Sequence, residues 1–267
     1  NDMMISGNLI NANTENGIAI SSIGANQLNL PNMRPDSFEI LGNTITNNSL
    51  DGIDFLIGSD ADVLANLDMN VIDANALNGI HVSKQINDAK DSRSITGLWT
   101  RNMIRDNGDD GIDLQGFLGN VLNDPIAGSM TPIPGAGTFP RYGLVIGDVA
   151  INPVGVLSPM GNVITGNAAD GVQIVGGGVV TIGNNVIEEN GTLTLVPGLD
   201  AADPAGAGLP RVIHAGINIE GAAFENGTMQ NSAATDFTVD DLTLATAFQE
   251  VLAFSNRISR TNGDGVE

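Results

Sequence analysis

The chain has 267 residues, of which 42% are hydrophobic, 10 are basic and 31 are acidic, giving a formal net charge of −21. The length fits one elongated all-β domain as readily as two compact domains, and the negative charge disfavours binding to nucleic acid or to anionic membranes. The sequence contains no run of 18 apolar residues and no cysteine, so we expect no membrane insertion, no disulfide and no thiolate metal site.

A short motif recurs along the chain. Counted from its first Asn, the motif has an aliphatic residue at +2, a second Asn at +5, Asn or Asp at +8 and Gly at +9. In chain order the copies begin at Asn8, Asn43, Asn70, Asn102, Asn162 and Asn256. A seventh copy begins at Asn185, and we expect residues 215–219 to supply its second half. A unit of this kind buries its apolar face only against a neighbouring unit, which indicates a stack of coils.

Within each copy the hydrophobic residues alternate with period two, which is typical of β-strands. The residue two places after the first Asn is always Ile, and we expect these residues to face inward: Ile10, Ile45, Ile72, Ile104, Ile164, Ile187 and Ile258. After the glycine, inward pairs such as Ile53 and Phe55 enclose one outward residue. The outward column then contains Ala19, Asp54, His81, Asp113 and Gln173. Each copy therefore predicts two short strands joined by a polar corner.

Stacking also predicts roles for the polar corner residues. We expect a ladder of side-chain amides, each donating to the next, formed by Asn13, Asn48, Asn75, Asn107, Asn167 and Asn190. We expect the turn glycines to supply a positive φ where the chain enters the second strand: Gly17, Gly52, Gly79, Gly111, Gly171 and Gly265. These residues are interpreted as scaffold.

With these residues in place, the pattern resembles the right-handed parallel β-helix repeat of the pectin-lyase-like superfamily, including its carbohydrate-binding and sugar-hydrolase branches. The resemblance implies an all-β solenoid with long loop insertions. We interpret residues 1–267 as a single β-helix domain, with insertions at about 120–160 and 191–255. Residues 241–254 fit both a helix and a strand, because helical spacing and period-two alternation overlap there.

The resemblance is less informative about activity, because this fold supports lyases, hydrolases, epimerases, adhesins and structural fibres. The Gly-His-Gly segment of polygalacturonase-like members is absent. Lyase-like members combine acidic calcium ligands with an Arg or Lys base, which directs attention to the mixed patch Arg101, Arg105, Asp106, Asp109, Asp110 and Asp113. The alternative is a solvent-exposed corner held by ion pairs. We also expect Asp73 and Arg105 to pair between coils.

The outward column offers the candidate catalytic residues Asp54, His81 and Asp113. If their coils are neighbours, a carboxylate, an imidazole and a second carboxylate lie about 4.8 Å apart and could bind a metal or move protons. The alternative is a polar solvent face. Trp99 and Tyr142 are the only residues of their types, which leaves few aromatic side chains for a glycan platform.

No cofactor is required by the sequence. Structural calcium is the metal hypothesis, because Asp60, Asp62, Asp109 and Asp110 offer the hard oxygen ligands that this ion prefers. Neither an EF-hand spacing nor a glycine-rich calcium nonapeptide occurs. Surface acidity that serves solubility is the alternative.

The sequence as given begins and ends within repeat copies, so we expect a segment of a longer chain or a subunit that associates end to end. The favoured function is an extracellular or cell-surface structural or adhesive β-helix, a repeating unit of a fibre or filament. The alternative is a secreted polysaccharide-active enzyme (a lyase, hydrolase or epimerase) or a carbohydrate-binding module, with a glycan as partner.

Overall fold

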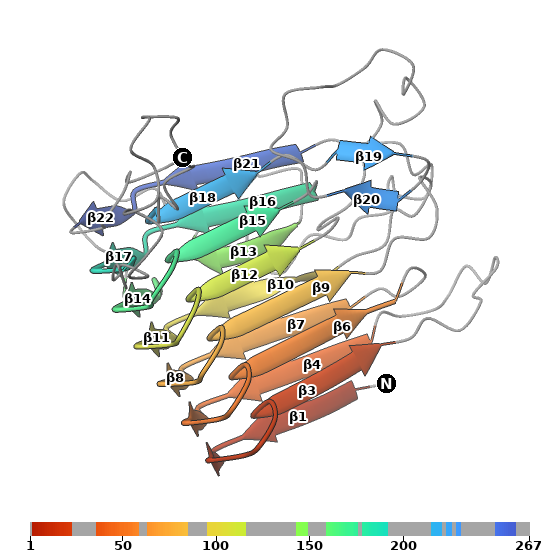
Figure 1. The fold of residues 1–267 in the computed structure, drawn as a ribbon, viewed down its shortest axis with the longest axis vertical. Coiled ribbons are helices and arrows are strands. Elements are labelled where there is room, and N and C mark those ends of the chain that lie inside the picture. Colours follow the sequence, from red (N-terminus) through yellow and green to blue (C-terminus); the bar gives the residue numbers. More distant parts are fainter. Residues whose placement is uncertain are drawn as a thin grey trace, which may run out of the picture.

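The protein is an all-β parallel β-helix (Figure 1). The computed structural model describes residues 2–22, 36–58, 63–84, 95–115, 143–148, 159–175, 178–191, 215–220, 223–225, 228–230 and 249–259. Within these ranges the elements are all strands. The strands form three stacked parallel sheets, and the coils follow one another from the N-terminal end of the stack to the C-terminal end (Figure 1).

Successive coils contribute one strand to each sheet, and the last described coil contributes strands to the first and second sheets. The first sheet contains β1 (Asp2–Ser6), β4 (Asp36–Leu41), β7 (Val63–Asp68), β10 (Ile95–Thr100), β13 (Leu144–Gly147), β16 (Gly178–Gly183) and β21 (Gln249–Phe254). The second contains β2 (Leu9–Asn11), β5 (Thr44–Thr46), β8 (Val71–Asp73), β11 (Met103–Arg105), β14 (Val163–Thr165), β17 (Val186–Glu188) and β22 (Arg257–Ser259). The third contains β3 (Ile18–Ser22), β6 (Ile53–Ile57), β9 (Ile80–Lys84), β12 (Ile112–Gln115), β15 (Val172–Val175) and β18 (Ile217–Glu220). A separate antiparallel pair joins β19 (Ala223–Glu225) to β20 (Thr228–Gln230).

The motif supplies the second and third sheets in the register that the sequence predicts. Ile45 pairs with Ile72 and Ile72 pairs with Ile104, so identical side chains stack inside the coil. The inward isoleucines from Ile45 to Ile187 are buried, and Ile10 and Ile258, in the outermost coils, pack partly buried against the same core. Burial of such a side chain contributes roughly 1.5–3 kcal/mol, so this column is a main source of stability.

The first sheet is the part that the motif does not include. Its strands precede the first Asn of each copy and alternate inward residues of their own, such as Phe38 and Ile40 in β4. Trp99 of β10 is fully buried, stacks on Phe55 with ring centroids 6.4 Å apart, and donates from Nε1 to the main-chain oxygen of Ala65 at 3.1 Å.

Two corners of the coils use left-handed backbone. On one corner the residue before the first Asn of a copy has φ between 53° and 65° in six of the seven copies, at Gly7, Gly42, Met69, Arg101, Asn184 and Ser255, and Gly161 is the exception. On the other corner the residue before the second Asn has φ between 54° and 69°, at Ala12, Asn47, Ala74, Asp106, Gly166 and Glu189. Only five of these twelve residues are Gly or Asn, the types that adopt this conformation most readily. The following asparagine therefore fixes the corner by its hydrogen bonds.

The turn glycines serve a different purpose from the one predicted, and the expectation of a positive φ is wrong for those described. Gly17, Gly52, Gly79, Gly111 and Gly171 are not among the positive-φ residues, and Gly265 lies outside the described residues. A Cβ at Gly52 would lie 2.6 Å from both Ile72 Cγ2 and the main-chain oxygen of Gly79. Glycine is required here because adjacent coils approach too closely for a side chain.

The two stretches assigned to insertions also contain sheet strands. β13 lies within 120–160, and it pairs with β10 and β16. Within 191–255, β18 pairs with β15 and β21 pairs with β16. Residues 215–219 thus supply the second half of the seventh copy, as predicted. Residues 249–254 form a strand, which decides part of the helix-or-strand question, and residues 241–248 lie outside the described residues.

Candidate functional site

Two asparagine ladders form the frame beside which the candidate site lies. In the ladder that the sequence predicts, each Nδ2 donates to the next Oδ1 from Asn13 to Asn190, at 2.8–3.0 Å. Each Oδ1 also accepts the main-chain N–H of the preceding ladder residue, for example from Asn75 to Asn107 at 3.1 Å. Because the amides are paired in this way, the ladder asparagines can be buried and still have hydrogen-bond partners.

A second ladder, which the sequence interpretation left unassigned, uses the first Asn of every copy. Nδ2 donates to the next Oδ1 at 2.9–3.0 Å through Asn8, Asn43, Asn70, Asn102, Asn162, Asn185 and Asn256. Its members from Asn43 on also donate to a main-chain oxygen of the first sheet, as Asn102 does to Leu67 at 2.9 Å. The sequence feature that could have predicted this second ladder is the recurrence of its Asn in every copy.

The residue before each turn glycine forms a third polar column. Asp51 Oδ1 accepts the main-chain N–H of Asn78 at 2.9 Å, and Asn78 Oδ1 accepts that of Asp110 at 3.0 Å. Asp110 Oδ1 in turn accepts the N–H of Asp170 at 2.6 Å. These side chains are buried, so the turn brings carboxylates next to the outward face of the third sheet.

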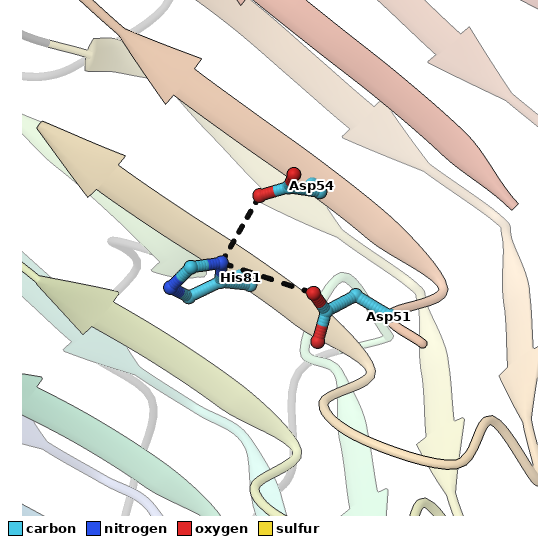
Figure 2. Close-up of side chains that lie close together, drawn as sticks. All are labelled: Asp51, Asp54 and His81. Atoms are coloured by element: carbon cyan, nitrogen blue, oxygen red, sulfur yellow. Dashed lines mark hydrogen bonds and ion pairs between the residues drawn. The ribbon is translucent and has the colours of Figure 1, made fainter. Parts of the chain in front are cut away.

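His81 lies at the centre of the candidate site, between carboxylates from the two coils on either side of its own. Its partner in the register of β6 and β9 is Asp54, and the Nδ1 atom lies 3.0 Å from Asp54 Oδ1. The same Nδ1 lies 3.8 Å from Asp51 Oδ2 at the neighbouring corner. Figure 2 shows both carboxylates turned toward this one ring nitrogen. Because strand register and the corner fix all three backbones, the side chains converge without a flexible loop.

The opposite side of the imidazole faces Asp113 of β12. Asp113 Oδ2 lies 3.8 Å from His81 Nε2 and accepts a hydrogen bond from Gln115 Nε2 at 2.7 Å. With its amide nitrogen turned inward, Gln173 donates to Asp113 Oδ1 at 3.2 Å. Asp54, His81 and Asp113 are thus brought together. Asp113 is 4% exposed, so its interpretation as a solvent-facing residue is wrong, because neighbouring polar side chains surround it.

Burial and charge shift the pKa values in this cluster. Burial raises the pKa of Asp113 to about 6, although the charge of His81 and the Gln115 hydrogen bond oppose the shift. Burial, followed by the charge of Asp170, raises the pKa of Asp110 to about 8, and burial also raises the pKa of Asp51. Burial disfavours the charged imidazole, but the Asp54 hydrogen bond and the charges of Asp113 and Asp51 outweigh it and raise the pKa of His81. Asp110 therefore keeps at neutral pH a proton that an isolated carboxylic acid would release.

The mixed patch that resembled a lyase site is divided in the structure. Arg105 NH2 pairs with Asp73 Oδ2 at 3.0 Å, which confirms the expected pair between coils. Arg101 pairs with Asp68. Asp106 and Asp109 are exposed, Asp110 is buried, and Asp113 belongs to the His81 cluster. These six residues therefore do not converge on one point.

The remaining candidates fall partly outside the described residues. Asp60, Asp62 and Tyr142 are not described, so the structure does not place the first calcium pair. Trp99 is in the core, where no sugar can stack on it. The residue that the sequence interpretation missed is Asp51, which occupies the Asn-or-Asp position before the turn glycine of the motif. Its position three places before Asp54, across the turn glycine, was the available signal.

Comparisons with protein-family models, with curated proteins and with solved structures find no match for this chain. The described residues contain no helix that is long and apolar enough to span a bilayer.

Proposed function

We propose that this protein is a structural or adhesive β-helix of the extracellular or cell surface, of the pectin-lyase-like type that its repeat resembles. The observation that supports this proposal is the pair of asparagine ladders, which run through successive coils from Asn8 to Asn256 and from Asn13 to Asn190. Residues repeated in every copy serve the scaffold, and ordered amides along its length favour a stiff rod. The extracellular location rests on the resemblance alone.

End-to-end association is part of the proposal. β1, β2 and β3 are the outermost strands of their sheets, and each has one hydrogen-bonded neighbour among the described strands. Met4 is 66% exposed and Leu9 is 73% exposed on this coil. An open strand edge pairs readily with another strand, and a further coil of the same geometry would reduce the exposure of these outward side chains. Met103, which occupies the position of Leu9 in an inner coil, is 39% exposed. A second copy of this chain is the occupant we propose.

Electron microscopy of the purified protein at several concentrations tests this assembly. We expect rods of uniform width that lengthen with concentration, and we expect the Met4→Lys, Leu9→Lys double variant to shorten them. Leu56→Lys, at a half-exposed position in an inner coil, is the matched control and should leave the length unchanged. Particles of one length at every concentration, or equal lengths for the double variant and the control, would contradict end-to-end association.

The second candidate function is a polysaccharide-active enzyme, and the contact among Asp54, His81 and Asp113 favours it. An acid and a base with shifted pKa values in one cluster are common at catalytic sites. Incubation with uronate polymers, followed by assays for unsaturated products and reducing ends, tests this candidate. Activity that disappears in Asp113→Asn would establish the enzyme, whereas no product from the intact protein would exclude action on uronates.

A further inference from the structure

We propose that Asp51, Asp54 and His81 form a binding site for a divalent first-row transition-metal ion, with zinc as the best-matched ion. The three donor atoms, one from each side chain, lie within 4.8 Å of one another (Figure 2). They come from a corner and two adjacent parallel strands, so their positions are set before any ligand arrives.

The separations fit a metal coordination shell. In a tetrahedral zinc site with metal–ligand bonds of about 2.0–2.2 Å, ligand atoms lie about 3.3–3.6 Å apart. His81 Nδ1 lies 3.0 Å from Asp54 Oδ1, just below this range, and 3.8 Å from Asp51 Oδ2, just above it. Small side-chain rotations would therefore suffice to bind the ion, and the backbone need not move.

The donor set selects the class of ion. One imidazole nitrogen with two carboxylate oxygens suits zinc and its first-row neighbours, whereas calcium takes six to eight oxygen ligands. This site therefore differs in residues and in chemistry from the calcium hypothesis drawn from the sequence. The His81 side chain is 21% exposed and that of Asp54 is 24% exposed, so solvent can supply the remaining ligands.

The far side of the imidazole supplies an independent argument. A metal on Nδ1 leaves the ring proton on Nε2, and metal-bound histidines usually donate that proton to a carboxylate or carbonyl oxygen. Asp113 Oδ2 is placed for this role at 3.8 Å, and Gln115 holds it from behind at 2.7 Å. Asp113 would thus orient His81 without contacting the ion.

Local charge also favours a cation. Asp51, Asp54 and Asp113 surround a single imidazole, so the cluster stays negative even when the ring is protonated. The arginine ion pairs of the described residues join Arg101 to Asp68, Arg105 to Asp73 and Arg257 to Glu188, on other parts of the stack. A bound divalent ion would displace the Nδ1 proton and neutralise the two ligating carboxylates.

Titration of the chelator-treated full chain with ZnCl₂ and CoCl₂ tests the proposal by calorimetry and by the visible absorption of cobalt. We expect one site per chain with proton release, no displacement by equimolar Ca²⁺, and at least 100-fold weaker binding in His81→Asn. Asp113→Asn should weaken binding 10–100-fold while keeping the stoichiometry, as expected for a residue behind the ligand. Asp73→Asn, an acidic change outside the site, and His214→Asn are the matched controls and should bind as the parent protein does.

Histidine NMR keeps the test decisive if a variant fails to fold. The chain has two histidines, so His214→Asn leaves the His81 imidazole as the only such signal. We expect its resonances to shift on addition of zinc and to shift strongly with paramagnetic cobalt. An unshifted His81 signal at saturating metal, equal affinity in His81→Asn, or preference for calcium would overturn the proposal. None of these results bears on whether the chain forms rods.

Discussion

Asp110 shows how a single corner residue couples the stability of the fold to pH. It is 5% exposed, its Oδ1 accepts the N–H of Asp170, and its pKa is raised to about 8 by burial and then by the charge of Asp170. Because the unfolded value is 3.8, the folded chain binds more protons between these limits. Its stabilising contribution is complete below about pH 4 and is lost as the pH rises through about 8.

We therefore expect Asp110→Asn to stabilise the protein at alkaline pH. Asn is neutral and keeps the Oδ1 acceptor, and Asn16 and Asn78 already occupy this position in other coils. The gain in unfolding free energy should be roughly 3–6 kcal/mol at pH 8 and less than about 1 kcal/mol at pH 4. Urea unfolding at both pH values measures it. Asp106→Asn, on an exposed corner, is the control, and an equal gain at pH 4 and pH 8 would contradict the argument.

The ladder residue Asn107 is a second position where one side chain matters. Its Oδ1 accepts both the N–H of Asn75 at 3.1 Å and the Asn75 Nδ2 at 3.0 Å. Asn107→Ala leaves the buried Asn75 N–H without this acceptor and leaves Asn75 Nδ2 with only the main-chain oxygen of Ile45, at 3.4 Å, which should cost about 2–5 kcal/mol of unfolding free energy. Asn13→Ala, at the exposed end of the same ladder, removes only one donor to Asn48 and should cost less than about 1 kcal/mol. Equal losses in denaturant titrations of the two variants would contradict this account of the ladder.

Residue chemistry explains which site contacts could be predicted. Period-two alternation was enough to predict the column of Asp54, His81 and Asp113, because register alone determines which side chains face each other. The contribution of Asp51 and the burial of Asp113 depend on how the corner packs sideways against the strand. Such contacts depend on side-chain rotamers, which no periodicity encodes.

Strand β10 shows an irregularity that makes room for the largest core side chain. Its pairing with β7 is interrupted between Thr96 and Trp99, where Leu98 N donates to Asn66 Oδ1 instead. Gly97 has φ +142°, and a Cβ there would lie 1.9 Å from the main-chain oxygen of Ala65. The strand can follow this path only if position 97 has no side chain.

We accordingly expect Gly97→Ala to lower the melting temperature far more than Gly42→Ala does. Gly42 also has positive φ, +61°, but has no atom within 4 Å of the added methyl group, and Met69 and Arg101 adopt the same conformation in other coils. Gly42→Ala should cost only the left-handed backbone penalty, about 1–2 kcal/mol. Thermal unfolding followed by circular dichroism measures both. Similar melting temperatures for the two variants would show that β10 relaxes around the methyl group.

At the level of elements, the sequence predicts the second and third sheets, whose strands lie within the motif, and misses the first sheet. The strands of the first sheet also alternate, and all of them except β13 end two residues before the first Asn of a copy, so this spacing was the available signal. The motif as defined began only at that Asn, and β13 and β21 lie in the stretches assigned to insertions. The turn glycines were recognised for their position but given the wrong cause, because closeness between coils is a tertiary property.

Across the whole molecule, acidic residues outnumber basic ones by 31 to 10. The net charge is −21, and the three cross-coil arginine pairs among the described residues involve exposed or half-exposed arginine side chains, where each pair contributes only about 0–1 kcal/mol. Repulsion among the excess acidic residues should therefore exceed these attractions. Because salt shortens the screening length from about 30 Å at 0.01 M to about 10 Å at 0.1 M, repulsion between coils decreases over this range.

We therefore expect the melting temperature to rise as NaCl increases from 0.01 to 0.3 M at pH 7, measured with a chelator present so that metal binding does not contribute. The exposed double variant Asp106→Asn, Asp109→Asn removes two acidic charges, taking the net charge from −21 to −19, and should show a smaller rise. Arg257→Gln, which removes an exposed cation paired with Glu188, should show a larger one. A melting temperature that falls with salt would mean that the arginine pairs outweigh the repulsion. The order of the three slopes distinguishes screening of charge from a general effect of salt on apolar burial, because a general effect would change all three melting temperatures alike.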